Sequence, residues 1–391
     1  MATEVQLETQ PATVWWRDER KLGIFTQFMA ILVTGLLWWF LISNMLNNLT
    51  VPLGFDFLSL PAGFQLSFSL LPITLDSPIW RIIETGAVNT LIASALSVVF
   101  ATILGFLVGV MRLSHNWLIA RIATVYIEVM RNIPLLVQLL FWYIALTKAL
   151  PVVRQSIMFG PSVALNVRGL YMPSPILGIG SWMIPAGLIL GIVGAWFLGR
   201  WANDRQTRTG QQFPSGWAGL GLIILLPIIG NFLAGSPITW DIPELKGFNF
   251  QGGMHVQPEL IALTLGLTSY TAAYIAEIVR GGIIAISHGQ TEAALALGLK
   301  RSWTLRLVVI PQALRVIVPP LTSQYLNIVK NSTLAGMVGF PDLYSVIGTS
   351  QNQTGKSVEC IAILMAFYLV ISLLISLFMN WYNKRIALVE R

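Results

Sequence analysis

Charged residues and cysteines are scarce in this sequence, and each shortage excludes a class of protein. Only 10% of the 391 residues are charged, whereas soluble domains carry about 25%, and 55% are hydrophobic, with a mean hydropathy of +0.71. A chain of this composition is a polytopic membrane protein. The single cysteine, Cys360, allows no disulfide within the chain and no thiolate metal site, and we expect it to be a small buried residue.

Signatures of catalysis and of nucleotide binding are also missing. The three histidines, His115, His255 and His288, lie on flanks and loops without metal-ligand spacing, and no GxxxxGK(S/T) phosphate loop occurs. The sequence therefore predicts no enzyme, no metal site and no cofactor, and any ATP that drives the protein must bind to a separate subunit. The net charge of +7 is explained by basic residues flanking membrane spans, so no nucleic-acid partner is predicted.

Eight stretches are apolar and long enough to cross a membrane, which requires about 20 residues each. The first, Gly23 to Leu46, is too long for a signal-peptide core and lacks a small-residue cleavage site, so we expect a spanning anchor. The third contains Glu128 and Arg131, and the seventh contains Pro319-Pro320, which should kink or interrupt it. The predicted spans are 24–46, 86–111, 119–147, 183–200, 217–234, 259–281, 313–337 and 358–382.

Basic residues are distributed unevenly between the two sides of these spans. With the N-terminus in the cytoplasm, 16 of the 24 Lys and Arg residues fall in cytoplasmic segments and only five in outer loops. We therefore predict an all-α polytopic membrane protein with about eight transmembrane helices and both termini cytoplasmic. Two long outer segments, 47–85 and 148–182, are rich in Pro, Gly and Ser and are expected to be ordered loops or short re-entrant pieces.

The cytoplasmic segment 287–311 has a helical pattern although it lies between two spans. Ser287 with Gln290 three residues later is a capping-box signature, good helix formers follow, and Gly298 is placed to end the helix. A second helical run, capped at its first residue and closed by the proline at its end, is expected over 302–311. Such an Ala/Leu helix exposes apolar surface, so it either lies on lipid or docks a soluble partner.

The same segment resembles the EAA loop of ABC importer permeases. The matching residues are Glu292-Ala293-Ala294, then Gly298, then Val308-Val309-Ile310-Pro311, in which Val308 and Ile310 replace the family's Ile and Leu. In that family the loop is the coupling helix that sits in a cleft of the cytoplasmic ATPase. The resemblance therefore implies ATPase coupling for Gln290, Glu292, Ala293, Ala294, Gly298 and Pro311.

Four further stretches, in family order, resemble permeases of ABC importers for polar amino acids. They are 86–91, 131–138, 273–283 and 330–335. Asn132 and Ile133 depart from the common Gly-Thr of the second stretch, and the small residues that follow the first also fit helix packing alone. The resemblance implies the type I ABC importer transmembrane fold over 86–385, after an N-terminal segment, span and loop at 1–85, with two extra helices inserted at 149–258.

Two pairs of opposite charges lie within or near the spans at helical spacing. Glu128 and Arg131 share a helix face, so they either pair with each other or contact substrate along a polar path. Glu277 and Arg280 have the same spacing near the cytoplasmic side, where an ion pair would brace the loop that follows.

A polar group near the end of the seventh span is the other candidate for a translocation path. Lys330 either extends to the outer interface or lines a wet path. The hydroxyl groups of Thr268 and Ser269 either satisfy backbone groups or face the same path. The predicted path residues are Glu128, Arg131, Gln138, Thr268, Ser269, Lys330, Asn331, Ser332 and Thr333.

The resemblance also implies partners and a location. These are two cytoplasmic ATPase subunits, a periplasmic solute-binding protein, a second, paralogous permease and the lipid of the bacterial inner membrane. Asn331 stands where some relatives that carry cationic amino acids have Asp, so we expect a neutral or acidic L-amino acid.

An ion-gradient-driven secondary transporter is the main alternative. It would explain Glu128, Arg131 and Lys330 within spans but not the docking loop, and no inverted repeat is visible. A membrane anchor or receptor subunit would predict no polar groups converging at mid-membrane depth.

Overall fold

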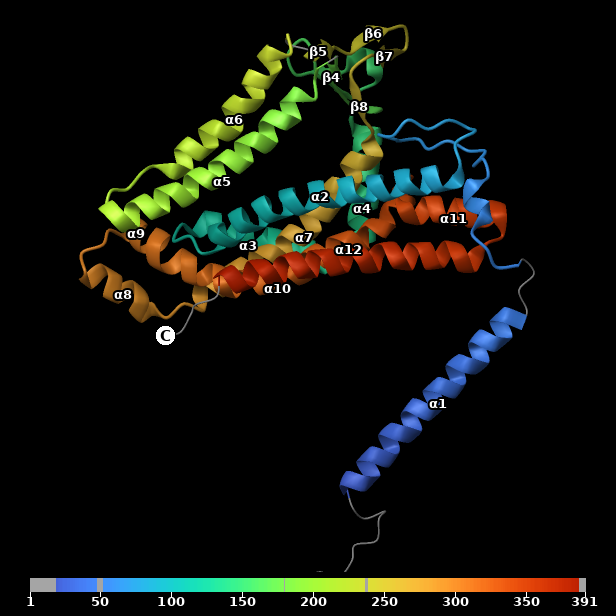
Figure 1. Ribbon diagram of the computed structural model, residues 1–391, viewed down its shortest axis with the longest axis horizontal. Helices are drawn as coiled ribbons and strands as arrows, with labels where there is room; N and C mark the ends of the chain where they lie inside the picture. The colour runs from blue at the N-terminus through green and yellow to red at the C-terminus, as the bar shows by residue number, and fades with distance from the viewer. Residues whose placement is uncertain (1–18, 48–51, 179, 236–237, 387–391) are drawn as a thin grey trace, which may run out of the picture.

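Helices make up most of the structure. The computed structural model describes residues 19–47, 52–178, 180–235 and 238–386 (Figure 1). Seven helices in these ranges are long and apolar enough to cross a membrane, or eight if one bent pair counts as a single span, which confirms the predicted fold class. α1 (Glu19–Asn47) extends away from the other helices, and none of its apolar stretch is buried by them.

The centre of the bundle is the contact between α2 (Ile79–Arg112) and α7 (Pro258–Ile284). A Cβ on Gly105 would lie 2.6 Å from the Cβ of Ile275, and one on Gly109 would lie 2.7 Å from a backbone carbonyl oxygen of α7. The predicted role of small residues in close packing is therefore confirmed. Around this pair, α4 (Leu135–Ala149) and α10 (Ile310–Asn331) pack on α7, and α12 (Ser357–Ile386) packs on α10.

The third predicted span consists of two helices rather than one. α3 (Trp117–Asn132) and α4 meet at an angle of 107°, so the single span predicted there is corrected to a bent pair. Pro134 causes the break, because it lacks an N–H and keeps Ile133 extended (φ −95°, ψ 128°). The Gln138 side chain then satisfies freed backbone groups, since its Nε2 donates to the carbonyl oxygens of Met130 (2.8 Å) and Ile133 (3.0 Å).

α10 continues through Pro319 and Pro320, where the sequence predicted a kink or an interruption. The chain is helical from Ser302 to Val338, with a π-helical turn at Leu305–Val309 before α10 and a 3-10 turn at Ser332–Val338 after it. Membrane helices tolerate proline when neighbouring helices and such local adjustments satisfy the freed backbone groups. The predicted interruption does not occur.

The outer ends of α2 and α12 are covered by a short helix, α11 (Leu343–Thr354). Asp342 caps it by accepting a hydrogen bond from the N–H of Ser345 at 3.0 Å, and burial raises the pKa of this carboxyl. The outer segment before α2 contains a 3-10 turn at Asp56–Ser59 and otherwise follows an irregular path, as expected of an ordered loop.

A layer of short strands lies at the outer ends of α4, α5, α6 and α7, where the sequence predicted loops or short re-entrant pieces (Figure 1). One antiparallel sheet has the order β1-β2-β3-β8, and β4-β5 and β6-β7 form two separate pairs. The strands contain two to four residues each, too few for the alternating pattern that identifies a strand in a sequence. They are β1 (Ile157–Met158), β2 (Ala164–Asn166), β3 (Gly169–Met172), β4 (Ser174–Leu177), β5 (Ile238–Asp241), β6 (Glu244–Lys246), β7 (Asn249–Gln251) and β8 (Met254–Val256).

The two extra helices form a hairpin, α5 (Met183–Thr209) and α6 (Ser215–Leu233), packed chiefly against each other. Their backbones touch at glycines. A Cβ on Gly187 would lie 2.6 Å from the carbonyl oxygen of Leu226, and one on Gly191 would lie 2.8 Å from that of Leu222. This small-xxx-small spacing permits close helix contact in lipid.

We predict that Gly191→Ala destabilises the purified protein, whereas Gly194→Ala does not. An added methyl at Gly191 meets backbone atoms of α6, and such overpacking costs about 1–3 kcal/mol. The same methyl at Gly194 meets only a side-chain atom at 3.5 Å, so alanine should gain up to about 1 kcal/mol of helix propensity there. Thermal unfolding of both variants tests this, and equal melting temperatures would contradict it.

We also predict that Gln138→Leu destabilises the fold, because it leaves two partly buried carbonyl oxygens at the bend without their donor. Each unsatisfied group costs about 1–3 kcal/mol. Val137→Leu at the neighbouring exposed position is the control, and thermal unfolding is the measurement. A Gln138→Leu protein as stable as the control would show that the bend does not depend on this side chain.

Candidate functional site

The cytoplasmic loop after α7 contains the predicted helix, α8 (His288–Ala296). Ser287 precedes it in an extended conformation, and Gly298 ends it in the left-handed region (φ +77°). The N–H of Leu299 donates to the carbonyl oxygen of Ala294 at 3.2 Å, which is the long bond of a Schellman motif. The predicted start and end of this helix are confirmed.

Two details of the predicted loop are wrong. No capping-box hydrogen bond forms from the Ser287 side chain, and the Gln290 Oε1 instead accepts a hydrogen bond from the Nε2 of Gln312 on α10 at 3.2 Å. The second run begins one residue early, as α9 (Arg301–Thr304), and Pro311 opens α10 instead of closing a helix, since proline suits the first turn.

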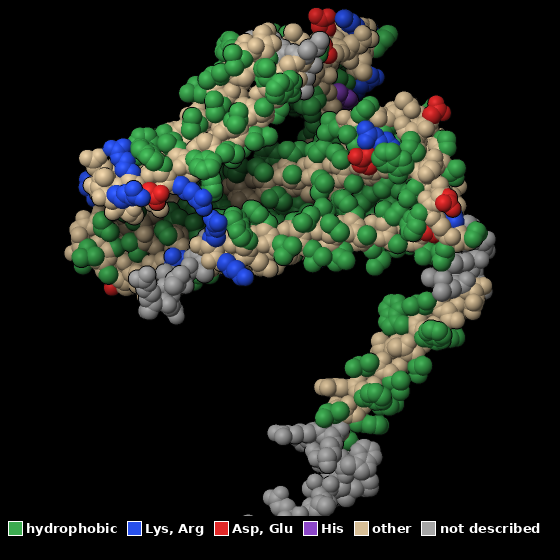
Figure 2. Space-filling model, viewed as in Figure 1, with side chains coloured by type: hydrophobic (Ala, Val, Ile, Leu, Met, Phe, Trp, Pro, Cys, Tyr) green, Lys and Arg blue, Asp and Glu red, His purple; other side chains and the backbone are tan. Residues whose placement is uncertain are grey.

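One residue of α8 is buried against the protein, and polar and apolar residues around it are exposed. Ala294 is buried, whereas Glu292 and Ala293 are exposed. Leu297 is 84% exposed, so an apolar side chain projects from the end of the helix. Basic side chains gather at the same end of the molecule, around the turn between α5 and α6, which agrees with the predicted cytoplasmic orientation (Figure 2).

A polar pocket of about 370 Å³, here called the inner pocket, lies between α2, α3 and α7. Glu277 on α7 organises one wall. It forms ion pairs with Arg112 at the end of α2 and with Arg280, whose Nε donates to its Oε1 at 3.0 Å. The predicted Glu277–Arg280 pair is therefore confirmed. The other lining residues are Ile127, Glu128, Arg131, Asn132 and Tyr274.

Glu128 and Arg131 both line the inner pocket, but they do not pair with each other. The Arg131 guanidinium instead lies over the Tyr274 ring, 5.2 Å from its centroid, in a cation–π contact. The Glu128 carboxylate has no ion pair or hydrogen bond within the part of the chain that the structure describes. Besides the paired Arg112 and Glu277, the pocket therefore presents Arg131 and Glu128, which do not neutralise each other.

Gln138, Thr268 and Ser269 lie outside the inner pocket. The Ser269 Oγ donates to the carbonyl oxygen of Leu265 at 2.7 Å and accepts from the Nε1 of Trp142 at 3.3 Å. With Gln138 at the bend, it belongs to a buried hydrogen-bonded contact between α4 and α7. Thr268 lines a separate apolar groove between α2 and α7.

The four polar residues that end α10 are also remote from the inner pocket. Lys330 is exposed and has no ion pair among the described residues, and Asn331 is half-buried. Ser332 is buried, and its Oγ donates to the carbonyl oxygen of Val329 at 2.7 Å. The Thr333 hydroxyl donates to the carbonyl oxygen of Lys330 at 2.8 Å. Two of the predicted path residues thus satisfy their own helix end.

Sequence reasoning missed Arg112 and Tyr274 as residues of the inner pocket. Arg112 lies 165 residues from Glu277 along the chain, so no local spacing reveals their contact. The only available signal was the basic residue at the cytoplasmic end of a span.

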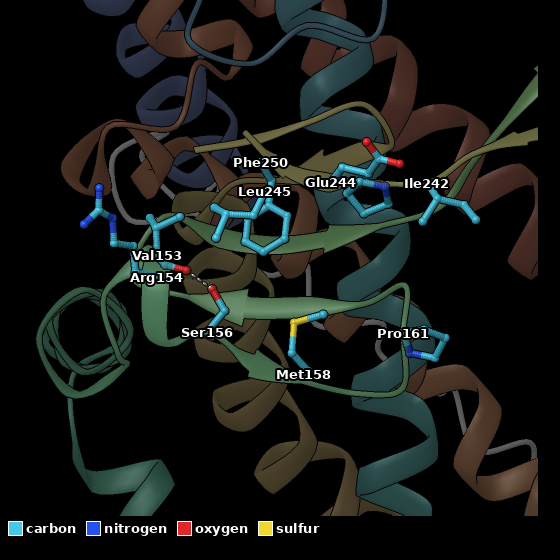
Figure 3. Close-up of a pocket in the computed structure, with 10 residues that line it drawn as sticks. Val153, Arg154, Ser156, Met158, Pro161, Ile242, Glu244, Leu245 and Phe250 are labelled. Atoms are coloured by element: carbon cyan, nitrogen blue, oxygen red, sulfur yellow. Dashed lines mark hydrogen bonds between the residues drawn. The ribbon is translucent and has the colours of Figure 1, made fainter. Parts of the chain in front are cut away.

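A pocket of about 500 Å³ lies within the strand layer (Figure 3). Ser156 is engaged there, since its Oγ donates to the carbonyl oxygen of Val153 at 2.6 Å, and Arg154 points away, over the Phe248 ring. The walls are mainly apolar, from Val153, Met158, Leu245 and Phe250. This pocket contains none of the predicted site residues.

Comparison with known proteins identifies the family. A family model described as binding-protein-dependent transport system inner membrane component matches residues 205–388. The chain is 46% identical over 377 residues to the general L-amino acid transport system permease protein AapQ of Rhizobium johnstonii, covering 96% of this chain and 94% of that protein. It is 48% identical to the putative amino-acid ABC transporter permease protein YhdX of Escherichia coli, covering 94% of each.

A third relative agrees with these. The glutamate/glutamine/aspartate/asparagine transport system permease protein BztB of Rhodobacter capsulatus is 42% identical, and the match covers 96% of each chain. The chain therefore belongs to the amino acid permease subunits of ABC importers, which are integral proteins of the bacterial inner membrane.

Proposed function

We propose that this permease forms part of the translocation path for a neutral or acidic L-amino acid and couples that path to two cytoplasmic ATPase subunits through α8. ATP would bind only to those subunits. The single observation that carries the coupling role is the exposed helix α8, which is held on the cytoplasmic side by Ala294 and by the turn at Gly298.

The contacts of α8 suggest how a displacement of this helix would be transmitted to the membrane-spanning helices. The Gln290–Gln312 hydrogen bond links α8 directly to α10, and α10 packs on α7. Glu292 and Ala293 are exposed on the cytoplasmic surface of α8, where a partner could contact them. A partner that closes on ATP would thus bias a rigid-body switch between inward-open and outward-open states. In this proposal Gly298 and Pro311 set the directions in which the chain leaves α8 and enters α10.

The inner pocket suits the charged groups that all α-amino acids share. Arg131 can bind a carboxylate, and Glu128 can bind an ammonium group, because neither is neutralised by the other. We propose these two as substrate contacts. Gln138 and Ser269 support the path by fixing the bend beside it, while Thr268, Lys330, Asn331, Ser332 and Thr333 stay predictions as path residues.

The substrate and partners follow from the relatives and from the sequence. AapQ is named for L-amino acids in general, and BztB for glutamate, glutamine, aspartate and asparagine. The BztB name agrees with the expectation drawn from Asn331, whereas the AapQ name does not distinguish between classes of amino acid. A periplasmic solute-binding protein would deliver the amino acid, and a second, paralogous permease would complete the path. The relatives support this ATP-driven function rather than an ion-gradient transporter.

We predict that Gly298→Asp lowers uptake of labelled L-glutamate or L-alanine about tenfold or more in cells that express the full system. Aspartate adds a charge and a Cβ where the backbone is left-handed (φ +77°), so α8 can no longer end in the same direction.

Gly210→Asp is the matched control. Gly210 has the same conformation (φ +70°), equally open surroundings and a cytoplasmic position after α5. It should keep uptake near the wild-type level, with both variants present in the membrane. Normal uptake by Gly298→Asp, or equal loss in both, would contradict the coupling role.

We predict that Arg131→Gln and Glu128→Gln each lower uptake efficiency about tenfold or more, since a charge-assisted hydrogen bond contributes about 1.5–3 kcal/mol. Arg121→Gln is the control, because Arg121 lies on the same helix but outside the inner pocket. Uptake kinetics in membrane vesicles are the measurement. Wild-type kinetics for both pocket variants would remove the inner pocket from the path.

A further inference from the structure

A second polar pocket, of about 320 Å³, lies where the strand layer meets the outer ends of α4 and α7. We propose that this outer pocket is a binding subsite for the carboxylate and ammonium groups of an amino acid before it enters the membrane path. The inference rests on the proposed function, because it assumes that the substrate is an amino acid. The residues that would bind it are Arg168, Asn249, Gln257 and Glu259, while Thr147 lines the pocket with its hydroxyl already donated to the carbonyl oxygen of Tyr143.

Arg168 is held at the pocket by the tip of the β2–β3 hairpin. The Asn166 Oδ1 accepts a hydrogen bond from the N–H of Arg168 at 2.8 Å, and the next residue, Gly169, has φ +118°. A Cβ on Gly169 would lie 2.2 Å from the carbonyl oxygen of Val256, so the hairpin lies directly on β8. The Arg168 side chain is exposed and has no ion pair among the described residues. It is therefore available to a carboxylate.

The rear wall of the outer pocket is rigid. The rings of Tyr171 and His255 stack at 4.4 Å, and a ring nitrogen of His255, Nε2, lies 2.7 Å from the carbonyl oxygen of Arg168. The Tyr171 hydroxyl donates to the Oδ1 of Asn249 at 2.9 Å, and burial raises the pKa of this phenol, so it remains a donor. The Nδ2 of Asn249 is thereby left to donate to a ligand.

Two acceptors on the opposite wall lack a positive partner. Glu259 lies in the first turn of α7, where the helix dipole favours a negative charge, and it forms no ion pair in the ranges that the structure describes. It accepts a long hydrogen bond of 3.4 Å from the Tyr143 hydroxyl. The Oε1 of Gln257 has no hydrogen-bond partner among the residues that the structure describes, while its Nε2 donates to the carbonyl oxygen of Ser67.

An ammonium group supplies three donors. Arg168 and Asn249 donate from the insertion, whereas Glu259 and Gln257 accept from the start of α7, which matches the two ends of a zwitterion.

The outer pocket is distinct from the inner pocket. Glu259 and Tyr274 lie on the same helix, 15 residues apart, which corresponds to about 22 Å along α7. One amino acid cannot span that distance, so the substrate would occupy two binding sites in succession, first the outer pocket and then the inner pocket. The insertion at 149–258 then has a defined role, because it supplies the donors Arg168 and Asn249 of the outer pocket.

Protection from a membrane-impermeant thiol reagent tests this subsite. Cys360 is buried, so a Thr147→Cys variant of the full permease complex carries one reactive thiol on this chain at the outer pocket. We expect excess L-glutamate, L-glutamine or L-alanine to slow its labelling about fivefold, the factor expected when most sites are occupied. Glutarate, which lacks the ammonium group, should not protect. Gln251→Cys, exposed on β7 and outside the pocket, should label equally with and without amino acid.

Adding Arg168→Gln or Glu259→Gln should abolish protection, whereas Arg154→Gln, elsewhere in the strand layer, should not. Val167→Cys, also at the pocket, is the second reporter if Thr147→Cys impairs assembly.

Wild-type uptake is measured in parallel. If the wild-type complex transports these amino acids but neither reporter is protected, the outer subsite is overturned while the proposed function stands. If the wild-type complex transports none of them, the proposed function fails and the subsite fails with it.

Discussion

The close backbone contact between α2 and α7 determines where the functional groups of this permease lie. Gly105 and Gly109 allow α2 to approach so closely that Arg112 reaches Glu277 on α7. α7 then carries Tyr274 against Arg131, presents Glu259 at its outer end and leads into α8 at its inner end. A side chain at either glycine would push α2 and α7 apart and disturb the wall of the inner pocket where Arg112 meets Glu277.

The bend between α3 and α4 is the second constraint. A right-angled break in a membrane would expose backbone groups to lipid, and that cost is avoided because Gln138 satisfies two carbonyl oxygens. After the bend α4 packs on α7, while α3 packs on both α2 and α7. Glu128 and Arg131 on α3 therefore line the inner pocket together with residues of α2 and α7.

The sequence predicted features correctly when the residues that determine them lie close together along the chain. The helix at 288–296, its end at Gly298 and the Glu277–Arg280 pair follow from residues within one or two turns, and all were predicted correctly. The inner pocket was predicted only in part, because Arg112 meets Glu277 through the fold alone. The strand layer was missed since its strands are too short for periodicity. The helix is not interrupted at Pro319-Pro320, because neighbouring helices and local adjustments satisfy the freed backbone groups.

The self-contained packing of α5 against α6 has a consequence for how the chain is made. A helical hairpin whose contacts are local in sequence forms early and needs no distant partner. It can therefore enter the bilayer as a closed unit while the ribosome is still synthesising α7. β4 lies before α5 and β5 lies after α6, so these two strands can pair only after α6 has crossed back to the outer side. The β4–β5 pair therefore forms only when the hairpin has reached its final topology.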